Sequence, residues 1–129
     1  MTKLFLLLAC AAFSVCVYSQ NAPKHSNAIV VKGATIKEAV PVLLSNGYMM
    51  DKIDTAFGLI YTRPKLVRGS DDVILQVAAK DAGIEISGQY DYGLKISNRG
   101  MKGSALKKGF EEMDRVAKAF NKEVEYKTN

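Results

Sequence analysis

Along residues 28–121 the spacing of hydrophobic residues changes several times, and each spacing predicts an element. The β-branched run 28–32 predicts a first strand. A helix follows from Thr35, where Glu38 completes a capping box, and Gly47 suits its C-terminal end. Its apolar stripe repeats every three or four positions: Ile36, Ala39, Val40, Leu43 and Leu44. Pro41 lacks a backbone N–H, so we expect a bend or an irregular first turn.

The middle of the chain predicts a series of strands. Two of them, on either side of a turn at 81–83, have one apolar side and one more polar side, which predicts a hairpin with one buried and one wetter face. Residues 64–71 are expected to form a polar loop. The predicted strands cover residues 48–53, 57–63, 73–80 and 84–90, with a brief last one at 94–96.

A second helix is predicted after Ser104, which suits an N-cap. Its apolar stripe consists of Leu106, Phe110, Met113, Ala117 and Phe120. The resulting order is β-α-β-β-β-β-α, and tight connections between successive strands make them antiparallel. The sequence therefore predicts an α+β fold: a two-layer domain, with an antiparallel sheet of four to five strands and two helices on one face.

The N-terminus predicts export. Lys3 precedes an apolar stretch that ends in Val17-Tyr18-Ser19, as in a signal peptide over residues 1–19 that is cleaved after Ser19. The stretch is shorter than the ~20 residues of a membrane-spanning helix, which argues against an N-terminal anchor. The remaining chain divides into a flexible leader (20–27), a single domain (28–121) and a polar, fraying tail (122–129).

Cys10 and Cys16 are the two cysteines of the chain, and both lie in the expected signal peptide. Leu7-Leu8-Ala9-Cys10 resembles a bacterial lipobox, so lipid anchoring at Cys10 stays open as an alternative to cleavage after Ser19. The rest of the chain has no cysteine, whereas small secreted eukaryotic domains usually depend on disulfides. We therefore expect an exported bacterial protein, periplasmic or secreted, with no transmembrane segment after processing.

Charge and residue types argue against several functions. The formal charge of +5 falls by one when Lys3 is lost, and no basic stripe typical of a nucleic-acid binder is present. His25 is the only histidine and lies in the expected leader, where a catalytic base would lack a fixed position. Zinc, copper and haem sites lack ligands. Asp71-Asp72 is more simply a turn than a calcium site. We expect no catalytic residue, metal or cofactor.

Two groups of residues are candidate binding sites. The first surrounds the start of the second helix, where basic groups and glycines meet a helix N-terminus, as in an anion site. It consists of Arg99, Lys102, Ser104, Lys107 and Lys108. The alternative is that these lysines are simply solvated and offset by Glu111 and Glu112. If the site exists, a concave pocket should lie beside Lys102 and Lys107.

The second candidate is a set of tyrosines, which on an open sheet face would stack on sugars or contact a partner protein. It consists of Tyr48, Tyr61, Tyr90 and Tyr92. The alternative is core packing, because tyrosine is common on half-buried strands.

The segment ending Val17-Tyr18-Ser19-Gln20, the cysteine-free remainder and the pattern Gly47-Tyr48 … Gly58-Leu59-Ile60-Tyr61-Thr62-Arg63-Pro64 resemble small exported proteins of Gram-negative bacteria. The element order over about residues 28–121 is similar to helix-grip domains of outer-membrane assembly lipoproteins. The resemblance implies a non-enzymatic envelope role. We expect a binding or adaptor domain that meets another envelope protein or an anionic envelope component; the alternatives are a binder of small anionic ligands at 99–108 and, third, an enzyme.

Overall fold

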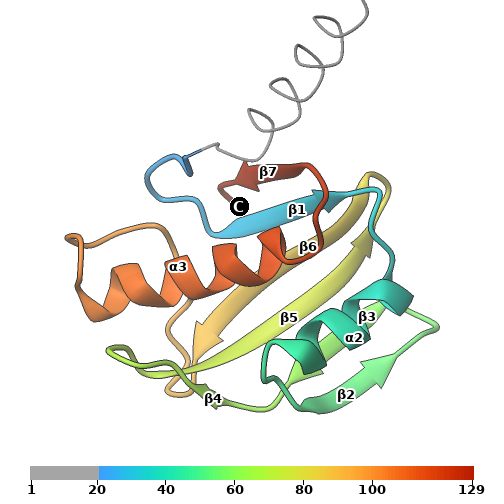
Figure 1. Ribbon diagram of the computed structural model, residues 1–129, viewed down its shortest axis with the longest axis horizontal. Helices are drawn as coiled ribbons and strands as arrows, with labels where there is room; N and C mark the ends of the chain where they lie inside the picture. Colours follow the sequence, from blue (N-terminus) through green and yellow to red (C-terminus); the bar gives the residue numbers. More distant parts are fainter. Residues whose placement is uncertain (1–20) are drawn as a thin grey trace, which may run out of the picture.

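The computed structural model describes residues 21–129, so the expected signal peptide and Cys10 lie outside the described part. Two helices and seven strands follow one another in this part of the chain (Figure 1). In order they are β1 (Ala28–Lys32), α2 (Ile36–Ser45), β2 (Met50–Asp54), β3 (Leu59–Thr62), β4 (Lys65–Leu66), β5 (Asp72–Lys80), β6 (Gly83–Tyr90), α3 (Ala105–Lys118) and β7 (Val124–Lys127). No helix among residues 21–129 is both long and apolar enough to cross a membrane.

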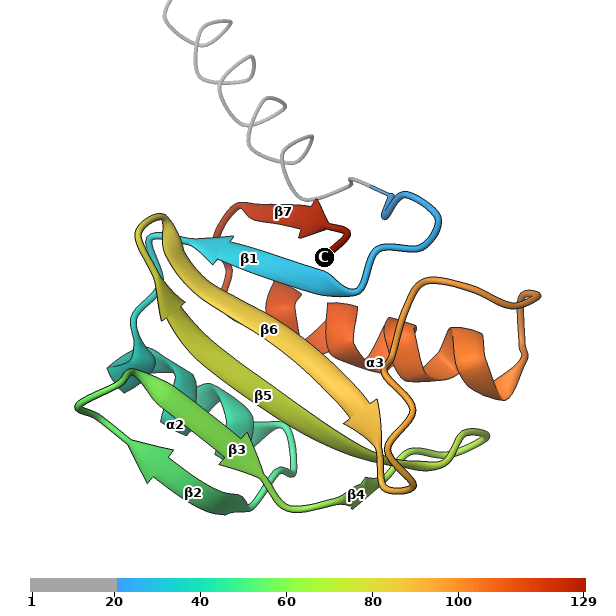
Figure 2. The ribbon, with the colours of Figure 1, turned by 180° about the vertical axis from the view of Figure 1, so that it is seen from behind.

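The strands form one antiparallel sheet in the order β2-β3-β5-β6-β1-β7, and β4 pairs with the start of β5. Both helices lie on the same face of this sheet, and the other face is open (Figure 2). The predicted α+β arrangement, with two layers and helices on one face, is confirmed. The strand count is seven in place of the four to five expected.

The core lies between the sheet and the helices, and it uses one side of each strand. In β5 the buried positions are Val73, Leu75 and Val77, and in β6 they are Ile84, Ile86 and Tyr90. The helices add a buried row each, with Leu43 from α2 and Phe110, Met113, Val116 and Ala117 from α3. Alternation in the strands thus decides which sheet face the helices cover.

Both predicted helix caps are present. The Thr35 hydroxyl accepts a hydrogen bond from the Glu38 amide at 3.2 Å, and the Ser104 hydroxyl accepts one from the Lys107 amide at 3.2 Å. Gly47 has a φ of 87°, which a residue with a side chain rarely adopts. α2 includes Pro41, so the helix accepts the loss of one backbone hydrogen bond in its interior.

The prediction of a fraying polar tail at 122–129 is wrong, because Val124–Lys127 forms the edge strand β7 beside β1. Its residues alternate, so that Tyr126 turns toward the core, packs against Phe110 with ring centroids 6.4 Å apart, and donates a hydrogen bond to Asp114 at 2.7 Å. A four-residue alternation flanked by lysines and glutamates was too short to distinguish from a solvated tail.

The expected flexible leader is likewise held against the domain. The backbones of residues 25 and 26 exchange hydrogen bonds with Asn98, at 2.8 and 2.7 Å. The Asn98 side chain donates to the carbonyls of Ala22 and Pro23, at 3.0 and 2.9 Å. Residues far apart in the chain make these contacts, so local polarity could not predict them.

Two smaller differences concern the loops. The expected loop 64–71 contains the two-residue strand β4, which pairs with β5. The brief strand expected at 94–96 is reduced to one bridge between Lys95 and Gln89. Ile96 from this segment is nevertheless fully buried and belongs to the core.

Gly109 marks the closest approach of α3 to the sheet. A Cβ at this position would lie 2.1 Å from the Tyr90 hydroxyl oxygen. That hydroxyl donates to the α3 carbonyl of Leu106, at 3.2 Å. The helix therefore sits on Tyr90 at a distance that only glycine allows.

We predict that Gly109→Ala lowers the free energy of unfolding by about 1–2 kcal/mol, although alanine favours helices by roughly 1 kcal/mol. The cause is the overlap with Tyr90, which forces α3 away from the sheet. Urea denaturation followed by circular dichroism measures the change. Glu111→Ala, on the exposed side of α3, is the control and should stay within about 0.5 kcal/mol of the parent. A more stable Gly109→Ala variant would contradict the close packing.

Candidate functional site

The open face of the sheet carries the polar half of each alternating strand. The pairing register places Tyr61 of β3, Gln76 of β5 and Ser87 of β6 side by side in one row. Ala28 of β1 continues this row. Neighbouring strands lie about 4.8 Å apart, so the row from Tyr61 to Ser87 spans roughly 10 Å. The side chains of Tyr61, Gln76 and Ser87 form a continuous polar strip across β3, β5 and β6.

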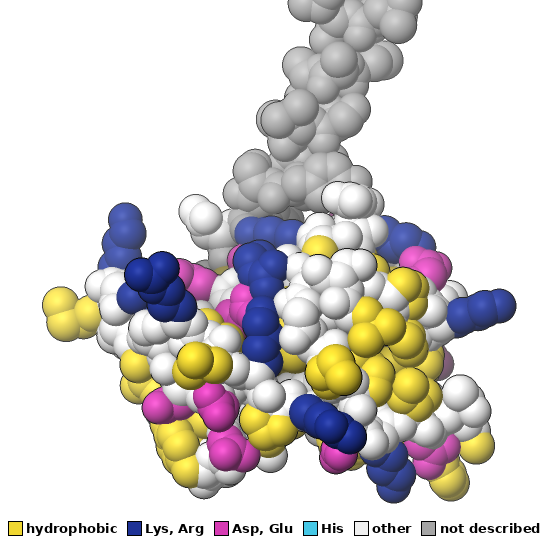
Figure 3. Space-filling view, turned by 60° about the horizontal axis from the view of Figure 1, so that its bottom comes forward, with side chains coloured by type: hydrophobic (Ala, Val, Ile, Leu, Met, Phe, Trp, Pro, Cys, Tyr) yellow, Lys and Arg dark blue, Asp and Glu magenta, His cyan; other side chains and the backbone are white. Residues whose placement is uncertain are grey.

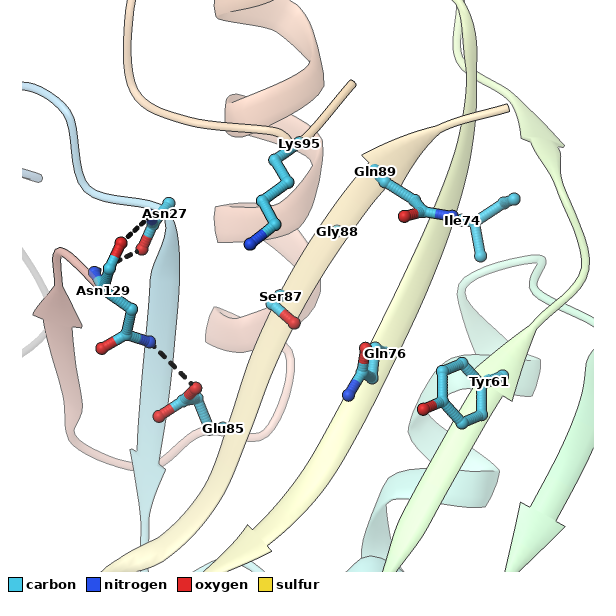
Figure 4. Close-up of a pocket in the computed structure, with 10 residues that line it drawn as sticks. All are labelled: Asn27, Tyr61, Ile74, Gln76, Glu85, Ser87, Gly88, Gln89, Lys95 and Asn129. Atoms are coloured by element: carbon cyan, nitrogen blue, oxygen red, sulfur yellow. Dashed lines mark hydrogen bonds between the residues drawn. The ribbon is translucent and has the colours of Figure 1, made fainter. Parts of the chain in front are cut away.

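A groove of about 310 Å³ lies over this strip (Figure 4). In the close-up the Tyr61 hydroxyl points toward Gln76, and the Gln76 amide points toward β6. The complete lining is Asn27, Tyr61, Ile74, Gln76, Glu85, Ser87, Gly88, Gln89, Lys95 and Asn129. Five of these residues carry an uncharged carboxamide or aliphatic hydroxyl, and Tyr61 adds a ring with a phenolic hydroxyl.

The floor of the groove differs from its rim. At the rim, Asn27 and Asn129 exchange two hydrogen bonds of 2.9 and 2.8 Å, and the Asn129 amide donates to Glu85 at 3.2 Å. These bonds fix the C-terminal end beside β6. On the floor, Gln76, Ser87 and Gln89 make no side-chain hydrogen bond with any residue among 21–129. Their donors and acceptors are available to a ligand.

The charge in the groove is low and balanced. Glu85 is the single carboxylate of the lining and Lys95 the single ammonium group. Nowhere among residues 21–129 do three His, Cys, Asp or Glu side chains gather closely enough to hold a metal ion. The arrangement is suited to hydrogen bonding with a neutral ligand rather than to proton transfer between paired groups.

The structure separates the four candidate tyrosines. Tyr48 and Tyr90 are buried to about 1% exposure, so the expectation that they contact a partner is wrong. Tyr92 is exposed and stacks on Tyr90, with ring centroids 5.6 Å apart, but it does not line the groove. Tyr61 alone combines partial exposure with a place in the groove. Tyr61 and Tyr90 lie in strands as predicted, whereas Tyr48 precedes β2 and Tyr92 follows β6. The face and depth of each ring depend on register and packing.

The basic candidates at the start of α3 have separate environments. Ser104 caps the helix, and the Lys107 ammonium group donates to the Asn98 carboxamide, so both are used within the fold. Arg99 and Lys102 are exposed, and Lys108 lies against Gly69. None of the five residues lines the groove. The lysine contact with Asn98 stabilises the loop that holds the leader, which is a structural role.

Most residues of the groove were not among the sequence candidates. Gln76, Ser87 and Gln89 were recognised only as polar positions of alternating strands. Their signal was present, because both strands carry carboxamides or hydroxyls on the same face. Asn27 comes from the expected leader, Lys95 from the expected brief strand 94–96 and Asn129 from the expected tail, and the sequence alone gives no reason to bring them together.

A second polar cluster lies on the helix side and centres on Glu112, which is 8% exposed. Its carboxylate accepts hydrogen bonds from Tyr48 at 2.8 Å, Lys65 at 3.0 Å and Arg115 at 2.6 Å. The Lys65 ammonium group also lies 4.7 Å from the centre of the Tyr48 ring and donates to the Asn46 carbonyl at 2.9 Å. The cluster ties together the end of α2, β4 and α3.

Burial opposes the charge of Glu112, but the hydrogen bonds from Arg115, Lys65 and Tyr48 outweigh it and hold the pKa of this carboxyl below its ordinary value. Burial, and then the neighbouring carboxylate, raise the pKa of Tyr48, so its hydroxyl stays protonated and donates. All these groups are occupied by one another, which indicates a structural cluster rather than a reactive one.

We predict that Glu112→Gln lowers the free energy of unfolding at pH 7 by about 2 kcal/mol, because charged hydrogen bonds are lost from a largely buried site. The pKa of Glu112 is lower in the folded state, so its stabilisation is complete above the unfolded value and disappears as the pH falls through the folded one. The difference between variant and parent should therefore shrink from pH 6 toward pH 3, which is measured by urea denaturation across that range. Glu111→Gln is the exposed control. A difference that stays constant with pH would contradict the charged role.

Two comparisons bear on identity. No protein-family model matches the chain, and a search of curated proteins found no match. Neither comparison relates the chain to an enzyme family. The functional argument therefore depends on the geometry of the groove.

Proposed function

We propose that this chain is a non-catalytic binding domain of the bacterial cell envelope that holds an uncharged, hydroxyl-rich ligand, of the saccharide class, in the groove on its open sheet face. One observation carries the proposal. Neutral hydrogen-bonding side chains without partners among residues 21–129 line a hollow that also contains the half-exposed ring of Tyr61.

The chemistry of the lining fits hydroxyl groups. A carboxamide carries both donors and an acceptor, so Gln76 and Gln89 each match neighbouring sugar hydroxyls, which also donate and accept. Ser87 adds a hydroxyl that works in either sense. The face of the Tyr61 ring offers an apolar surface for the C–H side of a sugar. An anionic ligand is less suited to the groove, because Lys95 would attract it while Glu85 would repel it.

The few charged groups in the groove also favour binding over catalysis. A volume of about 310 Å³ is at the lower end of ligand pockets. Hydrolysis of a glycosidic bond ordinarily needs two carboxyl groups on opposite sides of the bond, whereas the lining contributes Glu85 alone, and Asn129 already donates to it at 3.2 Å. The groove therefore supports recognition without bond cleavage.

For the place of action, the proposal rests on the sequence. The expected signal peptide at 1–19 and the resemblance to small exported proteins support the envelope, where saccharides are abundant on both sides of the outer membrane. The envelope protein partner expected from the sequence remains an alternative, with a peptide chain in the same groove in place of a glycan.

We predict that Gln76→Leu and Tyr61→Leu each weaken saccharide binding at least tenfold, about 1.4 kcal/mol, because one removes paired hydrogen bonds and the other the stacking ring. NMR titration of the labelled protein with maltotetraose, cellotetraose and chitotetraose measures affinity and locates the contact. Signals of Gln76, Ser87 and Gln89 should shift together with at least one of these probes.

Tyr92→Leu is the matched control, since it removes an exposed tyrosine outside the groove. It should leave the affinity unchanged. Absence of a shift in the groove with all three oligosaccharides, or shifts centred elsewhere, would refute the saccharide assignment.

A further inference from the structure

β2 lies at one end of the sheet and pairs on one side only, with β3. No strand among residues 21–129 covers its outer edge. Apolar side chains surround this edge: Leu44 at the end of α2 is 52% exposed, Met49 is 61% exposed, and Ile53 within β2 is 45% exposed. Figure 3 shows hydrophobic side chains gathered on the side of the molecule that carries α2 and β2. An uncovered strand edge beside apolar residues favours pairing with another chain.

The register of β2 places its charges on one face. Lys52 pairs with Tyr61 and Asp54 with Leu59, so both lie on the open face of the sheet, whereas Ile53 pairs with the buried Ile60 and lies on the helix side. Neither Lys52 nor Asp54 forms an ion pair with another residue of 21–129. One Asp54 oxygen accepts the Phe57 amide at 3.1 Å, which leaves the other available.

We propose that β2 is a self-association edge, at which two copies of this chain pair antiparallel about a two-fold axis at Ile53. In this register Ile53 lies opposite Ile53 of the second copy on the helix side. On the open face Lys52 lies opposite Asp54 of the second copy, and the symmetry repeats this contact. Opposite charges and apolar pairs directly across an antiparallel ladder both stabilise it.

The same charges select this register. Pairing centred on Lys52 would set two ammonium groups opposite each other, and pairing centred on Asp51 would do the same with two carboxylates. A lysine on an edge strand normally hinders pairing with other chains. Here Asp54 lies two residues further along on the same face. In a second copy of the same sequence, this Asp54 would lie opposite Lys52 and form an ion pair with it.

The opposite edge of the sheet, β7, is less suited to pairing. Its Glu125 lies 3.8 Å from the Lys32 ammonium group within the same copy. Leu44, Met49 and Ile53 are exposed hydrophobic residues beside β2, whereas β7 contains no exposed large hydrophobic residue. The two edges therefore differ in what they leave uncovered, and β2 is the one that a second copy fits.

The test uses protein purified after expression of the full chain, studied by sedimentation velocity up to about 1 mM. The parent should form a concentration-dependent dimer. Lys52→Glu and Asp54→Lys should each raise the dissociation constant at least tenfold, because each sets like charges opposite each other twice. An equimolar mixture of the two variants should restore the dimer, since every opposed pair then has opposite signs.

Asp51→Lys is the matched control for Asp54→Lys, because it makes the same charge change on the same strand outside the paired residues 52–54. Its dimer should persist, and circular dichroism should show all variants folded. A parent that stays monomeric overturns the proposal. Single variants that dimerise like the parent, or a mixture that does not recover the dimer, also overturn it. None of these results depends on whether the groove binds saccharide.

Discussion

The alternation of apolar and polar residues along β5 and β6 is the constraint on which the rest of the structure depends. Each of these central strands has one apolar side. Another layer must therefore cover that face of the sheet, while the other face stays exposed to solvent. α2 and α3 provide the cover, and their own stripes are buried in return. The opposite face is mainly polar along β5 and β6, so no third layer covers it and the groove stays open there.

The helix layer is held in place by a few specific contacts. Gly109 lets α3 approach the hydroxyl of Tyr90, and Glu112 joins α3 to α2 and β4 through Tyr48 and Lys65. Tyr48 and Tyr90, two of the four candidate binding tyrosines, are therefore parts of the core. Their hydroxyls reach polar groups of α3, which explains how such large, partly polar side chains are buried without an unsatisfied donor.

Periodicity and capping signals were sufficient to predict both helices, the main strands and the two-layer arrangement from the sequence. These local signals did not predict the parts of the fold that depend on contacts between residues far apart in the chain. β7 depends on pairing with β1, and the leader depends on Asn98, so neither could be recognised from local polarity. The groove could not be predicted from the sequence for a similar reason. Gln76 and Ser87 are neighbours only because of the β5–β6 register. Asn129 joins them only because β7 returns the chain to that face.

The two proposals together lead to a testable property of the assembled protein. Tyr61 lies one strand inward from β2, so pairing at the β2 edge would separate the two Tyr61 residues by three strand spacings across the sheet, about 14 Å, and by two residues along the strands. Both open faces would then form one continuous surface with two grooves. A repeating glycan that reaches both grooves would bind the dimer more tightly than its single units bind the monomer, because the second contact is intramolecular. Long oligosaccharides should therefore gain affinity over short ones with the parent and lose that gain with Lys52→Glu, whereas the affinity of a short oligosaccharide should be the same for both.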